Sequence, residues 1–250
     1  MTPGFCLSNQ PTHQKEREDL AASFRWVARM NMHESVANHF SLAVSDDGRQ
    51  FLMNPNGQHF SRIRASALLL LDADDKDAMQ RPDAPDPTAW AIHGAIHRSV
   101  PQARCIMHLH SKYATVIASL ADSTIYPIDQ NTMRFYDQVE IDDGFDGMGL
   151  GEEAERLATK VGTRPIVIMG NHGVLVTGPS VAQTFDSLYY FERACETLVT
   201  AYMTGRELRT ASHEVAAKTA RQWAEYPDFA DNHFKAIREI LDEEEPHYRH

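Results

Sequence analysis

The chain has 250 residues and a net charge of −11, with 42% hydrophobic and 24% charged residues, which is ordinary for a globular protein with a full core. The acidic balance and the lack of a basic stripe argue against a protein that binds duplex nucleic acid. Three scattered cysteines (Cys6, Cys105 and Cys195) fit a reducing compartment. Residues 1–16 lack the apolar core of a signal peptide, and no run approaches the roughly 20 apolar residues of a membrane helix. We therefore expect a soluble, cytoplasmic protein with no membrane partner.

The first part of the chain predicts a helix, a hairpin and a third strand. Apolar residues at helical spacing indicate an amphipathic helix over residues 12–32. Strands are expected over 38–44 and 50–53, joined by the turn Asp46-Asp47-Gly48, and a fully buried strand over 67–71. Asp86 as N-cap and Pro87 as the first helical residue predict a helix that runs to about residue 98.

The second part alternates further strands and helices. We expect a strand over 105–110, a helix over 111–120, a helix over 152–161, and a strand pair over 165–169 and 174–177, while 121–150 has no clear periodicity. Ser180 and Gln183 predict a capping box before a long helix that ends near Thr204, and two helices follow near 211–225 and 228–243. Hairpins mixed with helices indicate an α/β sandwich with a largely antiparallel sheet. We divide the chain into a domain over 1–210 and a helical extension over 211–250, packed on the same domain or on a neighbouring subunit.

Two histidines at the end of the 105–110 strand are the main chemical signal. Alternate residues of a strand share a face, so His108 and His110 point the same way and Leu109 the opposite way. Two imidazoles on a rigid strand supply half of a metal site. His172 is the best third ligand, because it lies in a glycine-flanked turn where backbone can approach closely, although a histidine that only caps a hairpin would look the same. Three histidines with an open fourth position indicate a catalytic rather than a structural metal.

Several stretches resemble the class II aldolase/adducin family, which includes fuculose-phosphate aldolase and ribulose-phosphate epimerase. They lie within residues 15–210 and are Asn38-His-Phe-Ser41, Asn54-Pro-Asn-Gly57, His93-Gly-Ala-Ile-His-Arg98, Pro101 to His110, Asn171-His-Gly-Val-Leu175 and Tyr189-Tyr-Phe-Glu-Arg-Ala194. The resemblance implies a three-layer α/β/α sandwich, and a homotetramer with sites between subunits. It also implies one divalent ion per subunit on His108, His110 and His172. Zn²⁺ is the ion we expect, while Mn²⁺, Fe²⁺ or Co²⁺ would be accepted by the same donors.

The chain departs from the family's sugar-phosphate aldolases at the group that moves protons. Those enzymes carry Ser-Ser-Glu-Trp where this sequence has Pro87-Thr-Ala-Trp90, so Ala89 replaces a glutamate that is both metal ligand and acid/base. Asn56-Gly57 replaces their Thr-Gly phosphate turn. A phosphate needs several convergent N–H and O–H donors, and fewer are present here. A phosphorylated substrate is therefore disfavoured.

Other residues are candidates for proton transfer and substrate binding. His93 and His97 follow Ala89 by one and two helical turns, and either imidazole could shuttle a proton or be a hydrogen-bonded core residue. The family gives a tyrosine a proton-donating role across the subunit interface, which Tyr136 could take. Substrate contacts are expected from Asn38, Ser41, Asn56, Gly57, Thr88 and Arg134.

The resemblance and the departures together predict a metal-dependent carbon–carbon lyase, either a decarboxylase or an aldolase, for a non-phosphorylated hydroxy or oxo carboxylic acid. The ion would act as a Lewis acid and stabilise an enolate. Decarboxylation needs only an acid to reprotonate the carbanion, which fits a chain that lacks the glutamate but keeps three histidines. Two alternatives remain open: a sugar-phosphate aldolase or epimerase, and a non-catalytic adducin-like assembly domain.

Overall fold

The computed structural model describes residues 12–144, 147–226 and 228–250, so Cys6 lies outside the described residues. The helices and strands, in chain order, are α1 (Gln14–Arg29), β1 (His39–Ala43), β2 (Gln50–Met53), β3 (Leu69–Asp72), α2 (Pro87–Ser99), β4 (Cys105–Leu109), α3 (Lys112–Ala118), α4 (Gln130–Arg134), β5 (Val139–Asp142), α5 (Glu152–Val161), β6 (Ile166–Met169), β7 (Gly173–Gly178), α6 (Val181–Met203), α7 (His213–Ala224) and α8 (Phe229–Glu244). Most of them coincide with the predicted ranges to within a few residues. Local periodicity and capping were therefore sufficient to locate them.

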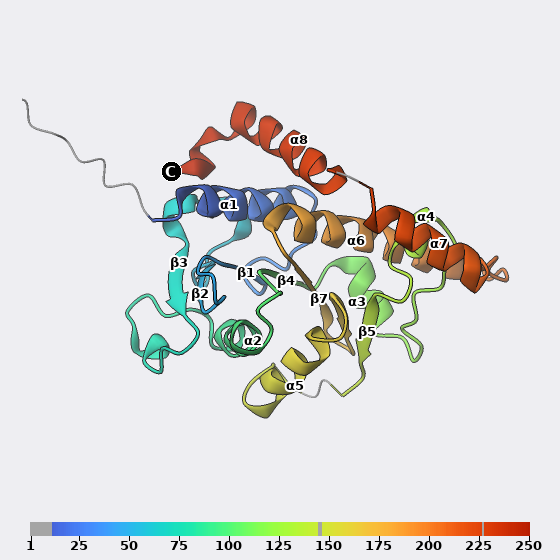
Figure 1. Ribbon diagram of the computed structural model, residues 1–250, viewed down its shortest axis with the longest axis horizontal. Helices are drawn as coiled ribbons and strands as arrows, with labels where there is room; N and C mark the ends of the chain where they lie inside the picture. Colours follow the sequence, from blue (N-terminus) through green and yellow to red (C-terminus); the bar gives the residue numbers. More distant parts are fainter. Residues whose placement is uncertain (1–11, 145–146, 227) are drawn as a thin grey trace, which may run out of the picture.

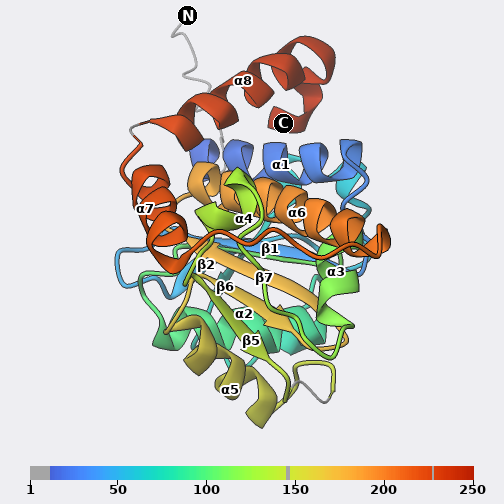
Figure 2. The ribbon, with the colours of Figure 1, turned by 90° about the vertical axis from the view of Figure 1, so that its right-hand side faces the viewer.

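The strands form one seven-stranded sheet in the order β3-β2-β1-β4-β7-β6-β5 (Figure 1). Every neighbouring pair is antiparallel except β5 and β6, which are parallel. Helices cover both faces of the sheet (Figure 2). The predicted three-layer α/β/α sandwich with a largely antiparallel sheet is confirmed.

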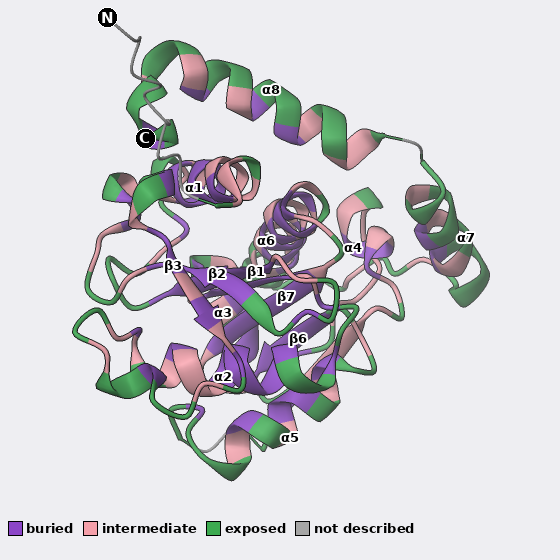
Figure 3. Ribbon diagram, turned by 60° about the vertical axis from the view of Figure 1, so that its left-hand side comes forward, coloured by how far each residue is buried: buried purple, intermediate pink, exposed green. Residues whose placement is uncertain are grey.

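Each face of the sheet packs against its own set of helices. Phe40, Met107 and Val176 belong to the core shared with α1, α3, α6 and α8. Ile106 and Leu175 belong to the core shared with α2 and α5. The strands are buried throughout the centre, while the outer faces of the helices are exposed (Figure 3). Because side chains alternate along β4, Leu109 lies on the α1–α6 side, and His108 lies with Ile106 on the α2–α5 side, as predicted.

Three details differ from the sequence predictions. β3 lies at the edge of the sheet, and its residues alternate between buried and half-buried, so it is not the fully buried strand that was predicted. α4 and β5 form within the 121–150 region. Before α6, the Ser180 hydroxyl accepts the Gln183 backbone N–H at 3.2 Å, which is one half of the predicted capping box.

The last two helices extend along the α1–α6 side of the molecule. α8 contacts α6 and α1, and α7 contacts α4. At the far end of α8, Arg29 pairs with Glu244 and Glu245. Within the described ranges, no helix has both the length and the apolar character needed to cross a membrane.

Candidate metal centre

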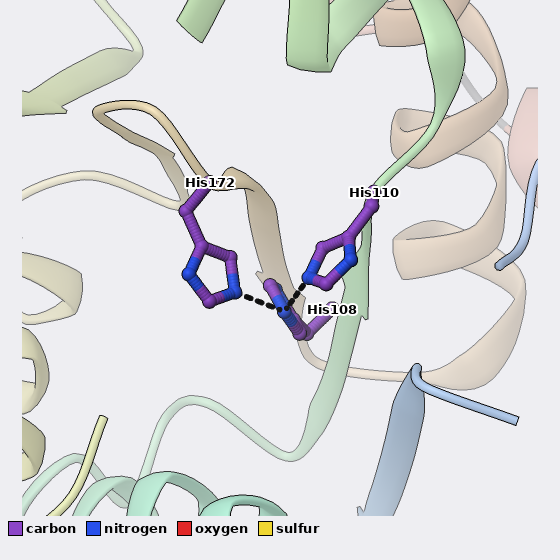
Figure 4. Close-up of side chains that lie close together, drawn as sticks. All are labelled: His108, His110 and His172. Carbon is purple, nitrogen blue, oxygen red and sulfur yellow. Dashed lines mark hydrogen bonds between the residues drawn. The ribbon is translucent and has the colours of Figure 1, made fainter. Parts of the chain in front are cut away.

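Three histidine rings meet at one end of the sheet (Figure 4). His108 is on β4, His110 follows that strand directly, and His172 lies in the turn between β6 and β7. The His108 Nε2 atom is 3.0 Å from His110 Nε2 and 3.2 Å from His172 Nε2. The structure therefore brings the three predicted metal ligands together, and they form a cluster whose ligand atoms all lie within 4.8 Å of one another.

Hydrogen bonds on the far side of two rings determine where their protons lie. His108 Nδ1 is 3.0 Å from the Val174 carbonyl oxygen, and His110 Nδ1 is 2.8 Å from the Glu34 carboxylate. Both partners can only accept, so each Nδ1 carries a hydrogen, and in the neutral ring each Nε2 presents a lone pair. Two lone pairs that face each other at 3.0 Å repel unless a proton or a metal cation lies between them. These donors fit a divalent ion held through Nε2 and oriented through Nδ1.

Burial keeps the rings in the form that binds metal. His108 is 1% exposed, and burial together with the neighbouring histidines lowers its pKa well below 6.5. The pKa of His172 falls to about 4, chiefly through burial and then through the proximity of His110. These two rings are neutral at pH 7, and only neutral imidazole donates a lone pair to a metal ion.

Gly173 allows the β6–β7 turn to approach the end of β4. A Cβ atom at this position would lie 2.5 Å from the Leu109 carbonyl oxygen and 2.9 Å from Cδ2 of the His110 ring. The preceding turn residue, Asn171, has a left-handed backbone (φ 55°), and its N–H donates to the Ala118 carbonyl at 2.8 Å. The chain therefore needs glycine after His172 to bring this ring to the other two.

A cavity of about 210 Å³ opens in front of the three histidines. Its other lining residues are Val36, Ala37, Asn38, His39, Asn54, Asn56, Asp86, Thr88, Ala89, Ile92 and Met148. Among the described lining residues there is no lysine and no arginine. The one carboxylate among these described lining residues, on Asp86, caps α2 and accepts the backbone N–H groups of Thr88 and Ala89. Of the predicted substrate residues, Asn38, Asn56 and Thr88 line this cavity, whereas Ser41, Gly57 and Arg134 do not.

Asn38 has a buried, unpaired hydrogen-bond donor beside the cavity. Its Oδ1 accepts the Glu34 backbone N–H at 2.7 Å. The residue is 1% exposed, and its Nδ2 has no hydrogen-bond partner in the described part of the chain. Because a buried unpaired amide is costly, this N–H group is suited to an acceptor on a bound molecule.

His93 and His97 lie behind the cavity and do not line it. His97 Nε2 is 2.8 Å from Ser41 Oγ, which is 2.5 Å from His93 Nδ1, and His93 Nε2 is 2.8 Å from His39 Nδ1. His39 does line the cavity, and its ring centroid is 4.8 Å from that of His108. Burial lowers the pKa values of His39 and His93 well below 6.5, and that of His97 to about 3.

His39 and Glu34 were not among the site residues predicted from the sequence. A signal for His39 was present, since strand alternation places it on the same face as Ser41, which faces the helix that carries His93. No comparable pattern pointed to Glu34, which lies in the loop before β1 and meets His110 only through the fold.

Arg134 and Tyr136 lie apart from the three histidines within this chain. The Arg134 guanidinium pairs with Asp186 and lies over the rings of Tyr190 and Trp223, at 4.8 and 5.1 Å from their centroids. The Tyr136 hydroxyl is 2.9 Å from His213 Nδ1. Their predicted roles would require a neighbouring subunit, and they stay predictions.

Comparison with known proteins agrees with this geometry. The family described as "Class II Aldolase and Adducin N-terminal domain" matches residues 18–199. A Pseudomonas aeruginosa protein assigned to the class 2 aldolases is 33% identical over 193 residues, which cover 77% of this chain and 73% of that protein. Decarboxylase NovR of Streptomyces niveus is 24% identical over 81% of this chain and 75% of its own length.

A solved structure shows the same fold. The crystal structure of an aldolase II superfamily protein from Pseudomonas syringae aligns with a TM-score of 0.86 and 28% identity, over 96% of this chain and 97% of that one. The family match covers most of the chain, and the structural match extends through the C-terminal helices. The chain belongs to the class II aldolase and adducin N-terminal domain family.

Proposed function

We propose that the protein is a metal-dependent carbon–carbon lyase for a non-phosphorylated hydroxy or oxo carboxylic acid, and that it acts as a decarboxylase or an aldolase. The observation that carries the proposal is the meeting of the His108, His110 and His172 Nε2 atoms at the end of a cavity. A divalent ion held there, Zn²⁺ above all, would act as a Lewis acid toward a substrate oxygen. Class II aldolases are generally lyases, and this chain keeps all three histidine ligands.

The lining of the cavity supports a substrate without phosphate. The Thr88 hydroxyl already donates to the Asp86 carboxylate at 2.6 Å, so it is not free for a phosphate oxygen. Asn38 Nδ2 is an unpaired buried donor, and the described lining residues include no lysine or arginine. A dianionic phosphate would meet Asp86 without enough donors. A substrate carboxylate that chelates the ion would need fewer hydrogen-bond donors from the protein.

We assign proton handling to His93 acting through His39. The His93 Nε2 atom is hydrogen-bonded to His39 Nδ1, which leaves His39 Nε2 as the ring atom available toward the cavity. A proton held at His39 Nε2 could pass to a substrate carbon and be replaced at the same atom from solvent after product release, while the His93 Nε2–H group, by donating to His39 Nδ1, would keep the proton of His39 on Nε2. Tyr136 of a neighbouring subunit, in the predicted homotetramer, is the alternative donor. Loss of turnover in His93→Gln but not in Tyr136→Phe would favour the histidine route.

The first test is the metal content of the purified protein by elemental analysis. Wild type should carry about one transition-metal ion per chain, and His108→Ala/His110→Ala should lose it. A matched control is His33→Ala/His59→Ala, because that pair also has Nε2 atoms 3.1 Å apart but belongs to no three-ligand cluster among the described residues. The control should keep its metal. A metal-free wild type, even after reloading, would instead support a non-catalytic assembly domain.

The second test separates the substrate classes. Metal-loaded protein should release CO₂ or an aldehyde from members of a panel of 2-oxo acids, 2-hydroxy acids and hydroxylated aromatic acids, and the His108→Ala/His110→Ala variant should not. Turnover of phosphorylated ketoses with none of these acids would contradict the substrate assignment and support a sugar-phosphate aldolase or epimerase.

A further inference from the structure

The backbone of His110 is held differently from that of His108. His108 lies inside β4, where it pairs with His39 on one side and Leu175 on the other. β4 ends at Leu109, and His110 has no partner in either register. The position of its main chain therefore depends on the next residues of the chain, Ser111 and the first turn of α3.

That first turn is bound to a buried carboxylate from a distant helix. Glu192, in the middle of α6, is 2% exposed. One of its carboxylate oxygens accepts the Ser111 hydroxyl at 2.6 Å and the Ala114 N–H at 3.0 Å, and the other accepts the Tyr113 N–H at 2.9 Å. Ser111 is the N-cap residue of α3, but its own side chain caps no backbone N–H. Glu192 supplies the acceptors that a capping side chain would normally provide.

We propose that Glu192 is a positioning residue that fixes His110 for metal binding by holding the turn that begins at Ser111. This inference rests on the proposed metal site. Both carboxylate oxygens are already used as acceptors. In Glu192→Gln, therefore, an NH₂ group must face at least one of the three donors, which leaves buried N–H or O–H groups without a partner. The turn would loosen next to His110, whose backbone the sheet does not hold. His108 and the pairing of β4 with its neighbouring strands would be unaffected.

The test compares two buried carboxylates on the same helix. Asp186 is also fully buried on α6, but it binds Arg134 and His233, away from the three histidines. Metal-stripped wild type, Glu192→Gln and Asp186→Asn are titrated with Zn²⁺ against a chelating indicator and loaded with Co²⁺ for visible absorption. Glu192→Gln should bind Zn²⁺ about 10–100-fold more weakly and change the Co²⁺ bands. Asp186→Asn should lower the melting temperature yet leave both readouts as in wild type.

Equal effects of the two variants on affinity, or unchanged affinity in Glu192→Gln, would overturn the inference. A wild type that binds no metal would overturn the proposed function instead. In that case the imidazole NMR signals of His110, assigned with His110→Ala, still decide the matter, because they should shift or broaden in Glu192→Gln alone. If Glu192→Gln does not fold, Ser111→Ala removes one of the three donors and should weaken Zn²⁺ binding in the same direction.

Discussion

At the scale of single residues, the candidate site depends on close approach and on groups behind the rings. Gly173 lets one turn reach the end of β4, and Glu34 orients a ring through its Nδ1 atom. Neither residue would bind the ion itself. Both should nevertheless change metal affinity when they are replaced, because a metal ligand works only in a defined position and tautomer.

Gly173→Ala should destabilise the fold and weaken metal binding. Its Cβ atom would meet the Leu109 backbone and the His110 ring at distances that require one of them to move. We expect a loss of about 1–3 kcal/mol in the free energy of unfolding, as for other overpacked positions. Gly178→Ala at the other end of β7 is the control, since its Cβ would lie 2.6 Å from Thr184 Oγ1. Both should melt earlier, but equal Zn²⁺ affinities in the two variants would contradict this account.

Glu34→Ala should weaken Zn²⁺ binding with little change in stability. The Glu34 side chain is 60% exposed, so its contact with His110 contributes little to folding. Without this acceptor, His110 can place its hydrogen on either nitrogen, and we expect about tenfold weaker binding in an isothermal titration. Glu155→Gln, which breaks another exposed ion pair with Arg98, should bind like wild type. Unchanged affinity in Glu34→Ala would mean that the carboxylate does not orient the ring.

At the scale of elements, α2 is joined to β1 by a buried polar chain through Ser41. His93 and His97 are 0% and 1% exposed, and each contacts the Ser41 hydroxyl. These hydrogen bonds stabilise the fold only while the rings are neutral, because a buried imidazolium without a carboxylate partner is strongly disfavoured. The packing of α2 on β1 should therefore weaken at acidic pH.

Stability should decrease as the pH falls below about 6.5. The pKa of His97 is about 3 in the folded protein against 6.5 ordinarily, so between these values the unfolded chain binds more protons than the folded one. Each such group makes the free energy of unfolding fall by up to about 1.4 kcal/mol per pH unit as the pH drops. His97→Gln should reduce this slope, measured by urea unfolding between pH 6.5 and 4.5. A slope equal to that of wild type would show that His97 does not titrate on unfolding.

At the scale of the whole molecule, a cation surrounded by aromatic rings connects α4, α6 and α7 with the start of α8. Asp186 binds Arg134 on one side and His233 of α8 on the other. The Arg134 guanidinium lies near the rings of Trp223 and Phe229, which the last two helices supply. At the opposite end of α8, Arg29 pairs with the exposed Glu244 and the half-buried Glu245, and we expect this contact to be weaker because solvent reaches it.

Arg134→Met should loosen the two C-terminal helices. Removal of one partner leaves a buried carboxylate without its arginine, which typically costs about 3–5 kcal/mol. Hydrogen exchange should accelerate in 213–244 more than in the sheet, while Zn²⁺ affinity stays unchanged. Arg29→Met is the control and should cost less than about 1 kcal/mol. If Arg134 instead contacts substrate from a neighbouring subunit, the variant should raise KM with stability preserved.

The sequence by itself determined the features that depend on neighbours along the chain. Alternation placed His108 and His110 on one face, the Asp86-Pro87 pair marked the start of α2, and the 152–161 helix was predicted at its observed bounds. These features follow from backbone geometry that repeats every 2 or 3.6 residues, so a local window contains the information. The glycine-flanked turn indicated His172 as the third ligand, and the family resemblance implied the complete ligand set and the three-layer arrangement.

Only the tertiary structure decided which groups surround those ligands. Glu34 reaches His110 across 76 positions of the chain, and Glu192 reaches Ser111 across 81. Likewise β5 carries only a short Val-Glu-Ile-Asp pattern and becomes a strand by pairing with β6. Contacts between residues so far apart in sequence are set by how helices pack on the sheet, and periodicity carries no information about that packing.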